Sequence, residues 1–409
     1  MDCGWFAGTV DGRSTIVERQ LQFNNLAEVA LFASVGGITD LRYRLAQRTG
    51  LKLRAPGRIA KLDQPLGEMY QRDVFFFPGY DVAGIKRYHR YLKRQCGWYQ
   101  RRFDVEFQVG DLTLTALDGW SVAQVTARWP EGSAKTSFYF CKWRDDVVKD
   151  YSPPAPVRVW RMLKAVAHLA FRGQITRTAR MGPNFTAALG LPVYLTILRA
   201  ICLTISLLLV ITGGWYIALG VLFGAGSIFG LRKLGGAFYQ AFFNNYLAYL
   251  ERVLHQTDHG IGDQLTGAIR SVVDHGGSAA LDRNELMIIG HSYGTVPAAI
   301  AAGKLTREGA DVSLLTIGSI AACVALSPQD HIFRPLAEAL HHSGRICWRE
   351  YFAPQDSLCF SRLNMKRDFG LTVAADEKAD VKVLSARFGD FVAVRKLRKF
   401  RNNLLRTHF

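Results

Sequence analysis

The sequence predicts an α/β fold, with a mostly parallel β-sheet covered by helices on both faces and an inserted two-helix membrane hairpin. Continuous apolar runs such as residues 74–78 and 286–289 are typical of strands buried on both faces. These runs alternate along the chain with segments of helical character, which favours a parallel sheet. The hairpin is predicted by an apolar stretch from Leu191 to Leu231 in which Arg199 is the one charged residue.

The 409 residues, 49% hydrophobic and 21% charged, are enough for one large domain or two ordinary ones. We expect residues 1–70 to form an N-terminal segment of unassigned role, with a helix within residues 24–48. Residues 71–184 form the first part of the α/β domain, residues 185–235 the hairpin, and residues 236–409 the second part with the motifs. The first residues lack a charged segment followed by an apolar run, so no cleaved secretory signal is expected.

Each element has a local signal. The run at residues 74–78 stops at Pro-Gly and predicts a strand that ends in a loop, and alternating residues at 103–129 predict strands or a hairpin. The other predicted strands are residues 137–143, 286–289, 312–326 with a turn, and 345–360 with a loop. The predicted helices are residues 85–95, 236–255, 263–274 and 297–305.

The apolar stretch divides at Gly213-Gly214 into Leu191–Ile211 and Trp215–Leu231. As helices these halves span roughly 31 and 26 Å, close to the thickness of a bilayer core. Two G-x-x-x-G spacings, Gly220/Gly224 and Gly226/Gly230, allow close helix packing. The alternative is a buried hairpin of a soluble protein.

The net charge of +17 and the pI of about 9.7 suit an anionic partner. The segment before the hairpin carries only basic charges, and Arg232 and Lys233 follow the hairpin, whereas its turn has none. By the positive-inside rule both flanks are cytoplasmic, and Arg199 could snorkel to that side. We therefore expect a multi-pass protein of the inner membrane of a bacterium, with the lipid bilayer as partner. The basic C-terminus, residues 395–406, could also touch headgroups, and no nucleic-acid motif is present. The basic residues before the hairpin are Arg158, Arg161, Lys164, Arg172, Arg177 and Arg180.

The seven cysteines form no C-x-x-C pair, and neither they nor the histidines have the spacing of a metal site. We expect free, buried thiols, no metal and no cofactor.

One motif points to chemistry, Gly290-His291-Ser292-Tyr293-Gly294, which follows a predicted strand and precedes a predicted helix. A sharp strand-to-helix turn holds a nucleophile in a strained conformation that bulky neighbours would obstruct. The helix N-terminus adds a positive dipole where negative charge develops. The alternative is an ordinary structural turn.

With this motif and its strand, the sequence resembles the α/β-hydrolase superfamily, in its lipase and esterase branch. The resemblance covers residues 70–140 and 260–409. It implies Ser292 as nucleophile, Asp356 as the acid, with Asp330 as runner-up, and His408 as the histidine, because the family orders these three along the chain. It also implies an oxyanion hole formed by the backbone N–H groups of Tyr293 and Tyr80, the latter in the "FFFPGYD" loop where Gly79 allows the turn.

The expectation is a membrane-anchored serine hydrolase, of the carboxylesterase or lipase type, acting on an acyl ester or related bond of a lipophilic substrate through a Ser-His-Asp triad. Acyl transfer to another alcohol would use the same residues. One alternative is a catalytically inactive hydrolase-fold membrane protein that acts in binding or assembly. Another is a protein that binds nucleic acid or anionic lipid, in which the motif is incidental. Asp356 could instead cap a turn, and His408 could be a tail residue.

Overall fold

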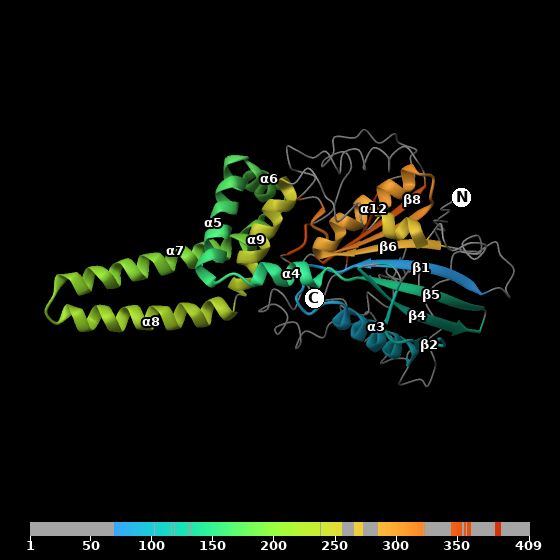
Figure 1. Ribbon diagram of the computed structural model, residues 1–409, viewed down its shortest axis with the longest axis horizontal. Coiled ribbons are helices and arrows are strands. Elements are labelled where there is room, and N and C mark those ends of the chain that lie inside the picture. The colour runs from blue at the N-terminus through green and yellow to red at the C-terminus, as the bar shows by residue number, and fades with distance from the viewer. Residues whose placement is uncertain are drawn as a thin grey trace, which may run out of the picture.

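The computed structural model describes residues 69–255 apart from 102, 116, 118, 131 and 238, and then residues 266–272, 285–321, 323, 345–353, 356, 358–360 and 381–385. In this part of the chain a 9-stranded sheet lies between helices, and a long helical hairpin extends from one end of the sheet (Figure 1). The predicted helix within residues 24–48 lies outside the described residues.

The sheet is mostly parallel, as predicted. Its strand order is β2-β4-β5-β1-β6-β7-β8-β9, with β3 paired to β4. The six strands from β5 to β9 in this order are parallel, and β4 is antiparallel to β5, β2 and β3. The strands are β1 Tyr70–Phe77, β2 Glu106–Val109, β3 Thr113–Leu114, β4 Trp120–Trp129, β5 Gly132–Cys141, β6 Glu285–His291, β7 Val312–Ile317, β8 Ile346–Phe352 and β9 Lys382–Ser385.

The predicted helices are present, and three further helices stand between the sheet and the hairpin. The predicted ones are α3 Ile85–Gln100, α9 Gln240–His255 and α12 Thr295–Arg307, and residues 266–272 of the predicted helix at 263–274 are helical. The helices without a sequence prediction are α4 Arg144–Tyr151, α5 Ala155–Phe171 and α6 Gln174–Met181.

Successive side chains of the central strands point to opposite faces of the sheet, as the two-residue period of a strand requires. On β1, Val74 and Phe76 pack with Leu92 of α3 on one face. Phe75 and Phe77 pack on the other face, in the core that includes the buried side of α12. Helices therefore cover both faces, and the strands are continuous apolar runs for that reason.

The hairpin consists of α7 Pro183–Thr212 and α8 Tyr216–Ala237, joined at Gly213 and Gly214. Both helices are long and apolar enough to cross a membrane, and only 6% and 17% of their most apolar windows are buried in the protein. Such low burial is unlike that of a soluble core helix, which argues against the alternative of a buried hairpin.

One of the two predicted small-residue spacings lies at the helix contact. A Cβ atom on Gly220 would lie 2.7 Å from the Ser206 carbonyl oxygen, and one on Gly224 would lie 2.5 Å from the Ser206 hydroxyl. That hydroxyl donates to the Gly220 carbonyl at 2.7 Å. The prediction for the second spacing was wrong within this hairpin, because Gly226 and Gly230 have nothing within 4 Å.

At the base of the hairpin Arg199 is tied to the neighbouring helix. Its Nη2 donates to the Leu231 carbonyl at 2.9 Å. From the sequence, this side chain could instead have extended to the cytoplasmic side. Gln240 at the start of α9 donates to Thr196 of α7 at 3.3 Å. The Leu231 carbonyl of α8 and the Gln240 amide of α9 thus supply polar partners for this part of α7.

The carboxyl ends of the parallel strands face the helices that carry the hairpin (Figure 1). Gln174 of α6 donates to the Cys323 carbonyl at 2.9 Å, and Phe185 of α7 contacts Phe360 with ring centroids 5.1 Å apart. Tyr249 of α9 contacts Tyr80, just beyond β1, at 4.9 Å. These helices therefore cover the edge of the sheet at which the motif after β6 lies.

Candidate active site

Ser292 lies at a sharp strand-to-helix turn. β6 is buried up to His291, Ser292–Gly294 form a single 3-10 turn, and α12 begins at Thr295. The φ of Ser292 is 54°, and Tyr239 is the other non-glycine residue with positive φ in the described part of the chain. A side chain in this left-handed region costs on the order of 1–3 kcal/mol unless the surroundings enforce it.

The two glycines of the motif are required by close packing. A Cβ atom on Gly290 would lie 2.5 Å from the Thr295 Cα, within the turn itself. A Cβ atom on Gly294 would lie 2.1 Å from the Phe77 carbonyl oxygen and 2.5 Å from that of Pro78. The first glycine lets the chain fold back on itself, and the second lets the turn press against the end of β1.

Thr295, which is fully buried, holds the turn in place. Its hydroxyl donates to the Ser292 carbonyl at 2.6 Å. The same oxygen accepts the Ser319 hydroxyl and the Ile320 N–H, each at 3.3 Å. The turn is thereby fixed to the segment after β7 as well as to the end of β1.

The loop after β1 lies beside this turn, and Tyr88 of α3 connects the two. The Tyr88 hydroxyl accepts the Gly79 N–H at 3.3 Å and lies 3.3 Å from Nδ1 of His291. Burial raises the pKa of Tyr88 well above its usual range, so its hydroxyl stays protonated. The Tyr80 N–H has no acceptor among the described residues.

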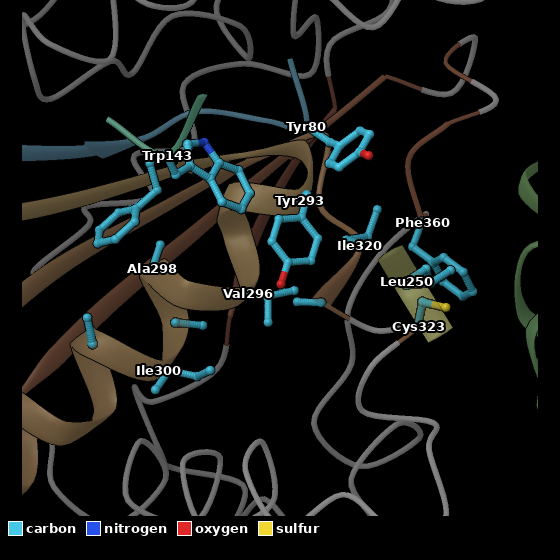
Figure 2. Close-up of a cluster of buried hydrophobic side chains, with 14 of the residues drawn as sticks. Tyr80, Trp143, Leu250, Tyr293, Val296, Ala298, Ile300, Ile320, Cys323 and Phe360 are labelled. Carbon is cyan, nitrogen blue, oxygen red and sulfur yellow. The ribbon is translucent and has the colours of Figure 1, made fainter. Parts of the chain in front are cut away.

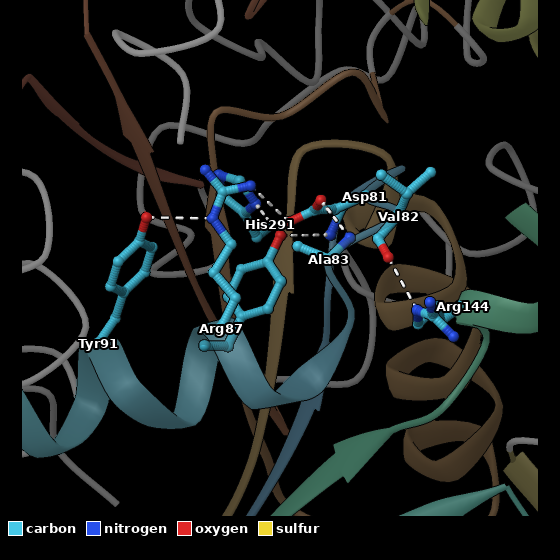
Figure 3. Close-up of polar contacts among 9 residues, drawn as sticks. Asp81, Val82, Ala83, Arg87, Tyr91, Arg144 and His291 are labelled. Atoms are coloured by element: carbon cyan, nitrogen blue, oxygen red, sulfur yellow. Dashed lines mark hydrogen bonds and ion pairs between the residues drawn. The ribbon is translucent and has the colours of Figure 1, made fainter. Parts of the chain in front are cut away.

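Charged groups brace the same loop (Figure 3). Asp81 accepts the Ala83 N–H at 2.8 Å and pairs with Arg87 at 3.0 Å, and Arg87 also donates to Tyr91 at 3.1 Å. Arg144 at the start of α4 donates to the Val82 carbonyl at 2.8 Å. The loop that carries Tyr80 is therefore held from both α3 and α4.

On the other side of the turn the side chains of Tyr80 and Tyr293 enter a buried aromatic cluster (Figure 2). Trp143 stacks on Tyr293 at 4.9 Å, and Tyr249 meets Tyr293 at 4.7 Å and Tyr80 at 4.9 Å. Burial raises the pKa of both Tyr80 and Tyr293. Aromatic pairs of this kind contribute roughly 0.5–1.5 kcal/mol each beyond burial, so α9 is firmly attached to the turn.

Asp150 of α4 completes the attachment. It accepts the Tyr80 hydroxyl at 3.0 Å and pairs with Arg252 of α9 at 2.7 Å. One carboxylate thus joins the loop after β1 to the helix that continues from the hairpin.

Asp356 lies beyond the end of β8 and is buried. Its Oδ1 accepts the Leu358 N–H at 2.9 Å and so caps a local turn. This is the structural role that was the alternative to a role in the triad. β8 is separated from β6 by β7, so the two strand ends are about 10 Å apart. An imidazole would have to stand between Asp356 and Ser292 for the two to act together.

Among the predicted site residues, Ser292, Tyr293 and Tyr80 are brought together, and Asp356 is at the same edge of the sheet. His408 and the runner-up Asp330 lie outside the described residues. Sequence reasoning did not find Tyr88, Asp150 or Thr295. Only Thr295 had a local signal, since it directly follows the motif. The described cysteines are all free thiols, four of them buried.

No family model, curated protein or solved structure matches this chain. The case for an activity therefore rests on the chain's own residues, and above all on the conformation of Ser292.

Proposed function

We propose that this chain is a membrane-anchored serine hydrolase that cleaves an acyl ester or related bond in a lipophilic substrate. Ser292 is the nucleophile, His408 the general base and Asp356 the group that orients the imidazole. The backbone N–H groups of Tyr293 and Tyr80 stabilise the oxyanion.

The observation that carries the proposal is the positive φ of Ser292 between two glycines that admit no Cβ. A purely structural turn at a φ of 54° favours glycine or asparagine, which adopt it at little cost. A serine in this strained conformation, at the N-terminus of a helix, is the geometry that presents a nucleophile.

The proposed reaction has two steps. The Ser292 hydroxyl oxygen attacks the carbonyl carbon while its proton passes to the imidazole of His408. The negative charge on the carbonyl oxygen is stabilised by the two N–H groups, near the positive end of α12. The alcohol leaves with the proton from the imidazole, and water then releases the acyl group from Ser292 by the same route.

The backbone arrangement supports the proposed oxyanion hole. Phe77 and Pro78 touch Gly294 so closely that the Tyr80 loop and the Ser292 turn form one packed unit. The Tyr88 hydroxyl accepts the Gly79 N–H. The backbone N–H of the next residue, Tyr80, is then the one that donates to the substrate. Rigid N–H groups of this kind are worth about 3–4 kcal/mol each in the transition state.

The lipophilic substrate is supported by the position of the hairpin. Helices α4, α6 and α9 and the start of α7 contact the carboxyl edge of the sheet, and Ser292 at this edge is only 5% exposed. Phe360, close to Asp356 in sequence, contacts Phe185 at the start of α7. A substrate that leaves the bilayer along the hairpin would meet the site directly. The basic flanks support a cytoplasmic orientation for the domain.

The test is covalent labelling of the membrane fraction with a fluorophosphonate, together with hydrolysis of esters of graded chain length. Wild-type protein should be labelled, and Ser292→Ala should abolish labelling and lower kcat by at least about 10³-fold. Ser137→Ala, within β5 where the hydroxyl bonds to Gln124 of β4, is the matched control and should be labelled like wild type. If the wild type stays unlabelled where a control hydrolase is labelled, the chain keeps this scaffold for binding or assembly instead.

A further inference from the structure

The helix α5 exposes a face that mixes aromatic, apolar and cationic side chains. Trp160 is 68% exposed and Phe171 is 91% exposed, and Val157 is also exposed. Arg161 and Lys164 are exposed between them. At 100° per residue these five side chains fall within one stripe about 100° wide, which we call the α5 face.

The opposite side of α5 is packed against the protein. Met162, Ala165 and Leu169 are buried. His168, which falls within the stripe, pairs with Glu251 of α9 at 3.0 Å. The helix is therefore held in place by its buried side, and the α5 face is not an incomplete part of the core.

Apart from Glu251, which pairs with His168, the charged residues around the α5 face are basic. From residue 152 to residue 250 every charged residue is Arg or Lys, since no Asp or Glu occurs there. Arg177 and Arg180 on α6, the next helix along the chain, are exposed. Arg232 and Lys233 on the last turns of α8 are exposed as well. These cations lie where the chain leads into and out of the hairpin.

The α5 helix lies across the base of the hairpin rather than along it (Figure 1). With α7 and α8 crossing a bilayer, α5 would run along the headgroup layer. Tryptophan is enriched at that depth, and arginine and lysine there attract anionic lipids.

We propose that the α5 face binds the headgroup region of the bilayer and selects anionic phospholipids. Trp160 and Phe171 enter the interface, while Arg161 and Lys164 pair with lipid phosphates. An acidic protein surface would match the charge but not the exposed aromatics beside two apolar spanning helices, so the lipid is favoured. This binding does not depend on the activity proposed for Ser292.

The experiment uses the full chain in bilayer nanodiscs and the fluorescence of Trp160, obtained as the difference between wild type and Trp160→Phe. Brominated phosphatidylglycerol and brominated phosphatidylcholine serve as quenchers. We expect quenching by both lipids and a preference for the anionic one. Each cation near the surface contributes roughly a 5-fold preference, so Arg161→Gln with Lys164→Gln should lower the preference by about 25-fold.

The matched control is Arg128→Gln with Lys135→Gln, an equal loss of charge at exposed positions of β4 and β5. It should leave the preference unchanged. Absence of Trp160 quenching in every bilayer would overturn the proposal, because the α5 face would then be in water or against a protein. Equal quenching by both lipids, unaffected by the α5 variants, would overturn the selection of anionic lipid.

Discussion

Replacing Gly294 by alanine tests the packing that defines the candidate site. The φ of Gly294 is −57° and its ψ −13°, an ordinary helical conformation, so alanine meets no backbone strain there. Helix propensity alone would favour alanine by about 1 kcal/mol. The added Cβ, however, would lie 2.1 Å from the Phe77 carbonyl oxygen, roughly 1 Å inside normal van der Waals contact.

Because the obstructing atoms are backbone, they can yield only if the turn moves away from β1. Overpacking of this kind costs about 3 kcal/mol or more, so the net loss is about 2 kcal/mol. The corresponding fall in Tm is roughly 2–4 °C. A 1 Å displacement of the turn should also slow fluorophosphonate labelling by about 10²-fold.

The assay is thermal unfolding in detergent, followed by tryptophan fluorescence, with labelling rates measured in parallel. Gly97→Ala on α3 is the control, since its Cβ would meet only Arg101 Nη1 at 3.7 Å. That variant should match or exceed the wild type in Tm. If Gly294→Ala has the Tm and labelling rate of Gly97→Ala, the Ser292 turn does not pack on β1 as described.

Three further outcomes follow from the structure. Ser292→Gly should be about 1 kcal/mol more stable than Ser292→Ala in chemical unfolding, because only glycine relieves the φ of 54°; equal stabilities would contradict the strain. Gly220→Leu should lower the thermal stability of the hairpin in micelles, because a Cβ would lie 2.7 Å from the Ser206 carbonyl oxygen, whereas Gly226→Leu meets open space and should not; a matching effect of both would refute the helix contact. Burial raises the pKa of Tyr151 from 10.0 to about 12. Its neutral form therefore contributes stability that is complete below pH 10 and lost as the pH rises towards 12. Tyr151→Phe should therefore lose less stability than the wild type between pH 10 and 12, as followed by tyrosinate absorbance. An unchanged profile would count against this assignment.

The central strands and the hairpin could be predicted because their signals are local. Phe75 to Phe77 and Met287 to Ile289 are apolar runs that a strand covered on both faces requires. The hairpin is an apolar stretch of membrane-spanning length, broken by Gly213 and Gly214. Ser292 was found because the glycines its strained turn needs are adjacent in sequence.

Long-range features left no such signal. Along the chain β2, β3 and β4 come between β1 and β5, yet β5 lies beside β1 in the sheet. Apolar runs cannot specify such a pairing. The helix α5 was interpreted only as a charged flank, because Trp160 and Phe171 lie among its cations. The roles of Tyr88 and Asp150 depend on partners far away in sequence. Gly226 and Gly230 have the spacing of a helix contact but face away from α7.

The most direct test of the central claim is to locate the covalent adduct. The full chain is treated with a fluorophosphonate in its membrane, digested, and the modified peptide is sequenced by mass spectrometry. We expect one adduct on Ser292, absent when the protein is unfolded before treatment. An adduct on another residue, or none under conditions that label a control hydrolase, would contradict the assignment of Ser292 as the nucleophile.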